Sequence, residues 1–254
     1  MKLAVSGKGG VGKTTLSATL AYLFKEHGSK VLAIDADPDA NLAGALGFKD
    51  LTGLKPISEM TELVAERTGS NPGTYGTFFS INPKVDDLPD TLAKEINGIR
   101  FMTLGGVKKG GGGCICPESV LLKSLVMNLV LNRDEVVIMD MEAGLEHLGR
   151  ATSTGVDALI VVTEPGQRSL ETARIVKKLS GDLGLKKVYV VGNKVRNQSD
   201  KDFIAQNVGS IPILGYIPMA DSIIDADRLG AAVFEKSPEA VEACREIYGK
   251  LVNR

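Results

Sequence analysis

The chain has no tryptophan, and aromatic residues make up only 5% of its 254 residues. Proteins that hold single-stranded nucleic acid stack the bases on aromatic side chains, so this composition argues against that class. The formal net charge is only −1, which gives the molecule no overall attraction to nucleic acid. We therefore expect no nucleic-acid partner.

Signals for export and membrane insertion are also missing. No run approaches the roughly 18 consecutive apolar residues that a spanning helix needs. Met1 and Lys2 lead directly into a strand-like run, without a signal-peptide core. The three cysteines are too few for a disulfide framework. These absences predict a reduced, cytoplasmic protein without a membrane partner, in which closely spaced cysteines serve metal or redox chemistry.

The rest of the composition is that of an ordinary globular protein, with 43% hydrophobic and 24% charged residues. Apolar runs alternate with helical patterns, and several runs are continuously apolar, as in strands covered on both faces. This order predicts an α/β fold: a doubly wound, mostly parallel sheet of about seven or eight strands flanked by helices. We expect strands at 2–6, 30–34, 99–104, 136–139, 158–163, 187–191 and 213–216, and helices at 13–27, 117–132, 168–183, 199–208 and 238–252.

A stretch rich in proline, glycine and asparagine, at about 52–98, interrupts this alternation. It is too short for an independent domain. We interpret residues 1–254 as one domain with an inserted excursion, which carries a short helix near 58–67.

A phosphate-binding loop follows the first strand. Residues 7–14 read G-K-G-G-V-G-K-T, the G-x-x-x-x-G-K-[ST] pattern between a strand and a helix. Glycines allow backbone N–H groups to turn toward phosphate oxygens, and the helix adds its positive end. Lys13 is expected to reach the β- and γ-phosphates, and Thr14 to bind Mg²⁺. The predicted nucleotide contacts of this loop are Gly9, Gly10, Val11, Gly12, Lys13, Thr14 and Thr15.

The loop contains a further lysine, Lys8, which indicates a particular class of P-loop protein. The K-G-G-x-G-K-T-T pattern resembles the MinD/ParA class of P-loop ATPases, which includes the nitrogenase iron protein and the arsenite pump ATPase. The resemblance implies a fold of that type and a face-to-face homodimer. It also implies that Lys8 reaches the partner's nucleotide, where a cation stabilises developing phosphoryl charge.

Two apolar strands end in aspartates. Val136–Asp140 is the Walker B arrangement, so Asp140 is expected to hold Mg²⁺. The acidic run after residue 34 matches switch I by resemblance: Asp37 orients the attacking water, and Asp35 lies nearer the Mg²⁺ shell.

Switch II is expected to follow Asp140, at Gly144. Many relatives have threonine or serine directly after this aspartate, whereas here Met141 and Glu142 follow. How this switch senses nucleotide is therefore open. His147 lies nearby and is expected to be a surface or capping residue.

The base pocket is expected at two later strand ends. By resemblance, Asn193 and Lys194 lie where the class reads the purine, and the Asn193 amide is able to donate to and accept from an adenine edge. The segment from Pro218 to Asp221 resembles the second base-side loop of the class.

Cys114 and Cys116 lie between a glycine tract and an expected helix. In extended chain, residues two apart share one face, so both sulfurs would address one ion. Their α-carbons would be ~6.5–7 Å apart, near the upper limit for a disulfide. A symmetric dimer would supply four thiolates, which suit Zn²⁺, Ni²⁺ or an iron–sulfur cluster. Cys244, alone on the last helix, is expected to fill space.

The deviant P-loop, the run from Asp140 to Arg150 and the C-x-C pair together resemble the CooC family, over essentially the whole chain. That family comprises MinD-type ATPases that deliver nickel to carbon monoxide dehydrogenase or acetyl-CoA synthase. The resemblance implies an ATP-hydrolysing metallochaperone that uses ATP and Mg²⁺ and binds Ni²⁺ or Zn²⁺ between protomers. Its client would be a metalloenzyme, such as nickel-containing carbon monoxide dehydrogenase.

Two alternatives stay open at this point. One is an iron–sulfur ATPase or cluster carrier like the nitrogenase iron protein, although there the two cysteines are far apart in sequence. The other is a ParA/MinD-like partitioning or positioning ATPase. Membrane-bound members of that kind carry a basic amphipathic C-terminal helix, whereas the charges of 238–254 are balanced here.

Overall fold

The computed structural model describes residues 1–50, 52–70, 78–105, 116–143 and 155–253. Eight strands of these residues form one sheet in the order β3-β4-β2-β5-β1-β6-β7-β8. Every neighbouring pair is parallel except β3 and β4. The strands are β1 (Lys2–Ser6), β2 (Val31–Ala36), β3 (Lys94–Ile96), β4 (Ile99–Thr103), β5 (Val136–Met141), β6 (Ala158–Thr163), β7 (Val188–Val195) and β8 (Ile213–Pro218).

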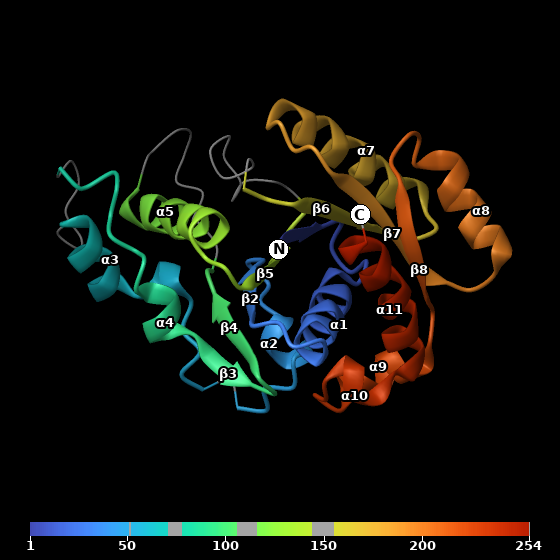
Figure 1. The fold of residues 1–254 in the computed structure, drawn as a ribbon, viewed down its shortest axis with the longest axis horizontal. Coiled ribbons are helices and arrows are strands. Elements are labelled where there is room, and N and C mark those ends of the chain that lie inside the picture. Colours follow the sequence, from blue (N-terminus) through green and yellow to red (C-terminus); the bar gives the residue numbers. More distant parts are fainter. Residues whose placement is uncertain (51, 71–77, 106–115, 144–154, 254) are drawn as a thin grey trace.

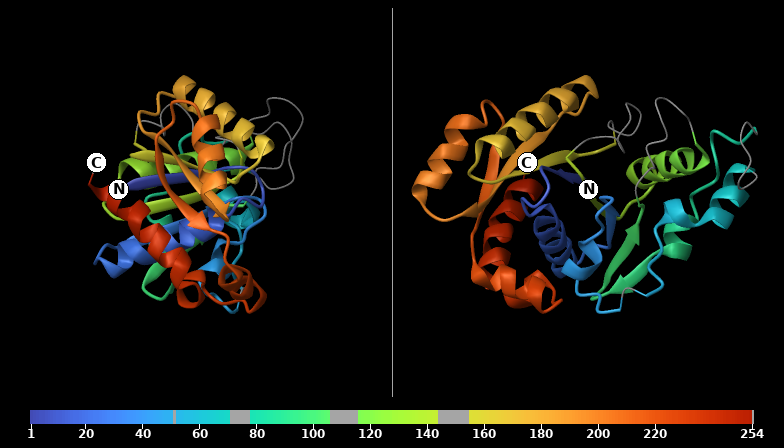
Figure 2. Two further views of the ribbon diagram at one scale, coloured as in Figure 1. Left: turned by 90° about the vertical axis from the view of Figure 1, so that its right-hand side faces the viewer. Right: turned by 180° about the vertical axis from the view of Figure 1, so that it is seen from behind.

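Helices cover both faces of the sheet, as Figures 1 and 2 show, so the predicted doubly wound α/β fold is confirmed. One face carries α1, α2 and α11, and the other carries α3, α5, α7 and α8. The helices are α1 (Lys13–Glu26), α2 (Leu42–Ala45), the 3₁₀ helix η1 (Ile57–Glu59), α3 (Thr61–Thr68), α4 (Leu88–Leu92), α5 (Pro117–Leu131), α7 (Gln167–Asp182), α8 (Gln198–Asn207), α9 (Asp221–Arg228), α10 (Val233–Lys236) and α11 (Pro238–Val252).

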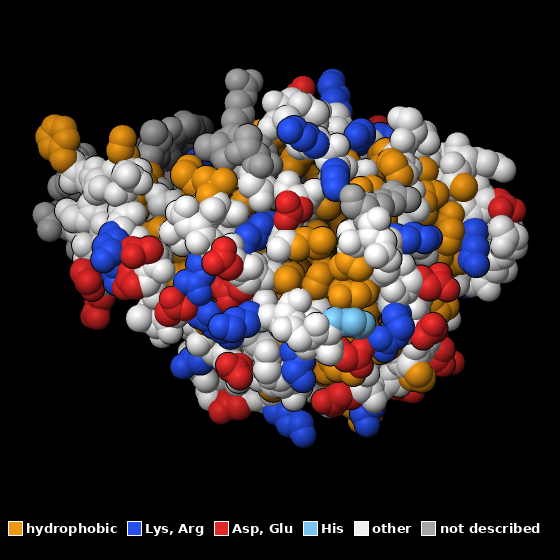
Figure 3. All heavy atoms as spheres, viewed as in Figure 1, with side chains coloured by type: hydrophobic (Ala, Val, Ile, Leu, Met, Phe, Trp, Pro, Cys, Tyr) orange, Lys and Arg blue, Asp and Glu red, His pale blue; other side chains and the backbone are white. Residues whose placement is uncertain are grey.

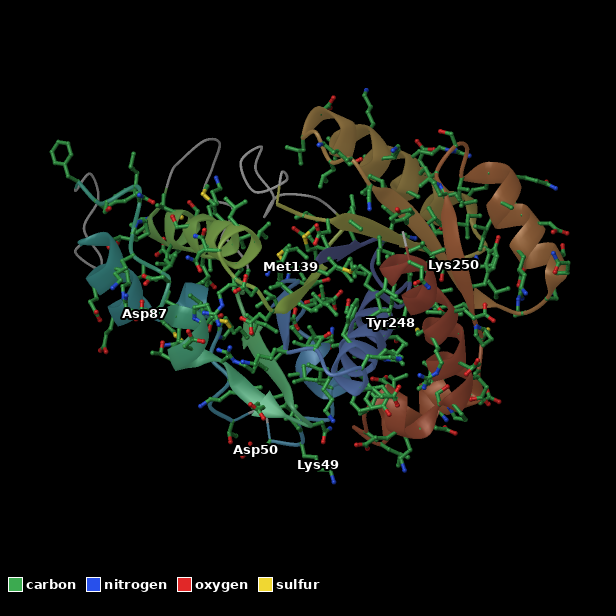
Figure 4. All side chains as sticks on the ribbon, viewed as in Figure 1. Lys49, Asp50, Asp87, Met139, Tyr248 and Lys250 are labelled. Carbon is green, nitrogen blue, oxygen red and sulfur yellow. The ribbon has the colours of Figure 1, made fainter. Side chains whose placement is uncertain are left out.

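The strands read as continuous apolar runs because each buries both sets of alternating side chains. In β1, Leu3 and Val5 join the core beneath α1 and α11, whereas Ala4 joins the core on the opposite face. The two helices of the first face also contact each other. Tyr248 of α11 packs edge-on against Phe24 of α1, with ring centroids 4.8 Å apart, and its position is labelled in Figure 4.

The excursion at about 52–98 is more closely integrated with the core than its composition indicates. Ile57, Val64 and Leu88 are buried in the same core as α5. The excursion ends in a β-hairpin that the sequence reading missed, in which β3 pairs antiparallel with β4. Asn97 and Gly98 both have positive φ, the backbone that a two-residue hairpin turn requires.

None of the helices in the described ranges is both long and apolar enough to cross a bilayer.

If residues 1–254 form one domain, we expect the protein to unfold in a single cooperative transition. Leu20 of α1 is fully buried, so Leu20→Ala should lower the free energy of unfolding by ~2–5 kcal/mol, the usual cost of a core cavity. Leu229, which is 68% exposed, provides the matched control, and Leu229→Ala should cost less than about 0.5 kcal/mol. Urea unfolding followed by circular dichroism and tyrosine fluorescence measures both. Two separated transitions in the wild type would contradict one cooperative unit.

Candidate nucleotide and magnesium site

The carboxyl ends of the central strands converge on one edge of the sheet. β1 lies between β5 and β6, so the loop after it is at the point where the strand order reverses, the usual place for a ligand in this architecture. Asp140 of β5 is in register with Val5 of β1 and with Asp35 of β2. The topology alone therefore places both aspartates beside the phosphate loop.

The loop backbone is shaped by glycines with positive φ. Gly7 has φ 152°, and a Cβ there would lie 2.4 Å from the carbonyl oxygen of Val162. Gly12 has φ 93° and caps α1, where a Cβ would lie 1.9 Å from the amide nitrogen of Asn193. The loop is thus pressed against β6 and β7, and α1 begins with its N–H groups at the loop.

Asn193 fixes the loop from the far side. It is buried, its Nδ2 donates to the carbonyl of Val11 at 2.7 Å, and its Oδ1 accepts the backbone N–H of Lys194 at 2.8 Å. This contact was not anticipated from the sequence. The expected hydrogen bonding of the Asn193 side chain to a purine base stays a prediction.

A cavity of about 430 Å³ lies on one side of the loop. Here the Lys13 ammonium and a carboxylate oxygen of Asp37 are 3.3 Å apart, with the two side chains 7% and 20% exposed. The predicted phosphate-binding lysine is therefore neutralised by the predicted switch I aspartate. The other lining residues are Gly9, Gly10, Gly12, Thr14, Asp39, Asn41, Glu142 and Ala143.

Asp140 and Thr14 form the part of this site suited to a cation. The Thr14 hydroxyl donates to Oδ2 of Asp140 at 2.7 Å, while Oδ1 is buried without a hydrogen-bond partner among the described residues. Burial raises the pKa of Asp140 to about 7, and the Thr14 hydrogen bond opposes the shift. A divalent cation would satisfy the unpaired oxygen and favour the carboxylate. These residues fit Mg²⁺, which typically takes one or two carboxylates and completes its shell with phosphate oxygens and water.

Asp35, the third expected magnesium residue, is fully buried, and its hydrogen bonds go to the main chain. Oδ1 accepts the N–H of Asp37 at 3.2 Å, and Oδ2 accepts the N–H of Leu42 at 2.9 Å. Burial raises its pKa to about 6, and these backbone bonds act against the shift.

A second, more apolar cavity of about 470 Å³ adjoins the first, because Gly10, Gly12, Thr14 and Asn41 line both. Of the residues expected to bind nucleotide, Thr15, Asn193, Lys194 and Pro218 line it. Asp221 is exposed at the start of α9 and is not among the lining residues in the described part of the chain.

Helices α9 and α10 close this second cavity and were not predicted. Met219, Ile223, Ile224 and Val233 contribute apolar lining. The polar and apolar residues that follow Pro218 could have signalled a short amphipathic helix. Lys194, which also lines this cavity, has φ 56° and pairs with Glu164 at 3.1 Å.

The remaining candidates are placed as follows. Lys8 is half-buried and makes no ion pair with a described residue. Cys116 is half-buried on extended backbone and caps α5, whereas Cys114, Gly144 and His147 lie outside the described residues. Cys244 is fully buried, as expected, and burial raises its pKa to about 12.

Comparisons with known proteins agree with this geometry. The model of the CobQ/CobB/MinD/ParA nucleotide binding domain matches residues 2–233. Over 95% of the chain and 94% of the relative, the sequence is 46% identical to an ATP-binding protein of Methanocaldococcus jannaschii. It is 43% identical, over 100% of the chain and 97% of the relative, to the carbon monoxide dehydrogenase accessory protein CooC of Rhodospirillum rubrum.

The chain belongs to the MinD/ParA family of P-loop ATPases, in its CooC branch. The protein is therefore an ATPase, and its family implies ATP and Mg²⁺. Among solved structures, the MinD cell division protein of Aquifex aeolicus matches with a TM-score of 0.70 over 100% of this chain and 97% of that one. At 22% identity, that likeness supports the fold alone.

The Lys13–Asp37 ion pair must break when a triphosphate arrives. Asp37→Asn should therefore bind a non-hydrolysable ATP analogue about fivefold more tightly, since such a pair is worth roughly 1 kcal/mol. Asp39→Asn is the matched control, because it removes a carboxylate from the same cavity without touching the pair. Titration calorimetry measures both. Equal tightening in the two variants would mean that general repulsion, and not this pair, opposes binding.

Proposed function

We propose that this protein is an ATP-hydrolysing metallochaperone that binds Ni²⁺ or Zn²⁺ through Cys114 and Cys116 between two protomers. It would assist metal insertion into a carbon monoxide dehydrogenase in the cytoplasm. The observation that carries the proposal is the 43% identity, along the whole chain, to a protein described as an accessory of that enzyme. The nucleotide cavities and the position of Cys116 at a helix start support the two halves of the activity.

In the nucleotide-binding part of this function, the triphosphate lies along Gly9–Thr15. Lys13 leaves its ion pair with Asp37 and binds the β- and γ-phosphates. Thr14 and Asp140 hold Mg²⁺, which supplies positive charge to the phosphate oxygens when bound. Asp37, released from Lys13, orients the attacking water. The purine lies in the apolar cavity beside Asn193, Lys194 and the Pro218–Asp221 segment, which extends to the start of α9.

In the metal half, two chains associate face to face, and the symmetry axis brings together two C-x-C pairs. The extended backbone at Cys116, with φ −101° and ψ 153°, is compatible with adjacent sulfurs on one face. Four thiolates would complete a site that the two cysteines of one chain leave unfinished.

A role on DNA or membranes finds less support in the surface. Lys and Arg side chains are interspersed with Asp and Glu over the face that Figure 3 shows, and the net charge is −1. Such a distribution gives little attraction to phosphate backbones or anionic lipid.

Lys8 tests the dimeric part of the nucleotide half. If it acts on the partner's phosphates, Lys8→Ala should lower kcat at least about 100-fold while ATP affinity changes little, as for arginine-finger residues. Lys49→Ala is the matched control: Lys49 is exposed at the lower edge in Figure 4 and should leave kcat unchanged. Steady-state hydrolysis and ATP binding measure the difference. A Lys8→Ala enzyme with full kcat would exclude hydrolysis in trans.

The cysteine pair tests the metal half. Under anaerobic conditions with ATP, the wild type should bind one Ni²⁺ or Zn²⁺ per two chains and have the mass of a dimer. The double variant Cys114→Ser/Cys116→Ser should bind none, whereas Cys244→Ala should bind as the wild type does. Equal loading of the double variant and the wild type would exclude this site. A brown protein with visible absorption would favour an iron–sulfur cluster instead.

A further inference from the structure

The carboxylate of Asp35 is enclosed by the switch I segment itself. Asp35 ends the apolar part of β2 and is 0% exposed, in register with Asp140 of β5. Its two oxygens accept the N–H groups of Asp37 and Leu42, at 3.2 and 2.9 Å. The intervening loop therefore turns around one buried side chain.

Asp37 makes three contacts in this structure, two within the switch I loop and one with Lys13 of the phosphate loop. Its backbone N–H is held by Asp35, its Oδ1 accepts the N–H of Asp39 at 3.1 Å, and its Oδ2 lies 3.3 Å from the Lys13 ammonium. Pro38 and Asp39 between these points are exposed. This part of the segment is therefore held by hydrogen bonds to carboxylates rather than by packing of Pro38 and Asp39.

From this arrangement we propose that Asp35 is a positioning residue for ATP hydrolysis. It sets the place of Asp37 relative to the phosphate loop by holding the two ends of the switch I turn, and its contribution to Mg²⁺ binding is minor. The proposal rests on the proposed role of Asp37 in orienting water.

The chemistry of the side chain explains why an aspartate is needed here. Only a carboxylate presents two acceptor oxygens, so it satisfies both main-chain donors, and charge-assisted bonds of this kind are the stronger ones. An asparagine would accept from one N–H and turn its own NH₂ toward the other. One end of the loop would then lose its anchor, and Asp37 would move relative to the γ-phosphate.

The test is Asp35→Asn, with kcat, KM for ATP and the Mg²⁺ activation midpoint measured together. We expect kcat to fall by about 10- to 100-fold, since a shift of roughly 1 Å in a reacting group has this effect. KM and the Mg²⁺ midpoint should change less than about threefold, because Thr14, Asp140 and the phosphate loop stay in place. A shift of about tenfold in the Mg²⁺ midpoint with kcat kept at saturating Mg²⁺ would overturn the proposal.

Amide hydrogen exchange gives a readout that does not depend on hydrolysis. In Asp35→Asn at least one of the two amides, that of Asp37 or that of Leu42, should exchange at least about tenfold faster than in the wild type, because the asparagine keeps only one acceptor oxygen. Asp50→Asn is the matched control: Asp50 is exposed and accepts the N–H of Thr52 at 2.8 Å, and this change should leave kcat and both amides unaltered. Unchanged exchange at Asp37 and Leu42 in Asp35→Asn would also overturn the proposal.

The variant Asp37→Asn distinguishes the proposed role of Asp35 from the proposed role of Asp37 in orienting water. If Asp35 acts through Asp37, the double variant should hydrolyse ATP no more slowly than Asp37→Asn alone. If Asp37→Asn keeps full hydrolysis, the proposed role of Asp37 is wrong. The exchange experiment would still show whether Asp35 holds the amides of Asp37 and Leu42. Should Asp35→Asn not fold, exchange in the wild type decides: both amides must exchange at least about tenfold more slowly than in an unstructured peptide of the same sequence.

Discussion

The organisation of the site depends on negative charge held out of water beside a phosphate loop. Asp35 and Asp140 are neighbours across β2 and β5, and both are buried. Ionised carboxylates in such a place are costly unless a cation or main-chain donors compensate them. Asp35 is compensated by backbone N–H groups, whereas Asp140 keeps one oxygen unpaired among the described residues. In our proposals this difference gives them different tasks: Asp35 shapes the switch I loop, and Asp140 holds the metal ion.

The fold offers a route between the nucleotide site and the proposed metal site. Cys116 begins α5, and only a short turn separates the end of that helix from β5, which carries Asp140. α5 also packs against α3 and η1 of the excursion, so the excursion supports the helix that presents the cysteine. A rearrangement at the end of β5 and one at the start of α5 would therefore act through a continuous, packed segment. Under the proposed function, nucleotide and metal would each change the affinity of the other.

Much of this was predictable from sequence because it rests on local patterns. Doubly buried strands must read as apolar runs, and the phosphate loop needs glycine where φ is positive, as at Gly12. What escaped depends on tertiary placement. The spacing of residues does not reveal that Asn193 would contact the carbonyl of Val11, or that the oxygens of Asp35 would go to the main chain. The β3–β4 hairpin is different, since Asn97 and Gly98 are a local turn signal that could have been recognised.

The most direct test of the account is whether nucleotide and metal bind in a coupled way. The dissociation constant for Ni²⁺ should be measured by chelator competition, with ADP and then with a non-hydrolysable ATP analogue. The account predicts a difference of at least about tenfold, with the same factor for the effect of Ni²⁺ on analogue binding, because linkage is reciprocal. Identical Ni²⁺ affinities in the two states, with nucleotide affinity indifferent to Ni²⁺, would contradict it.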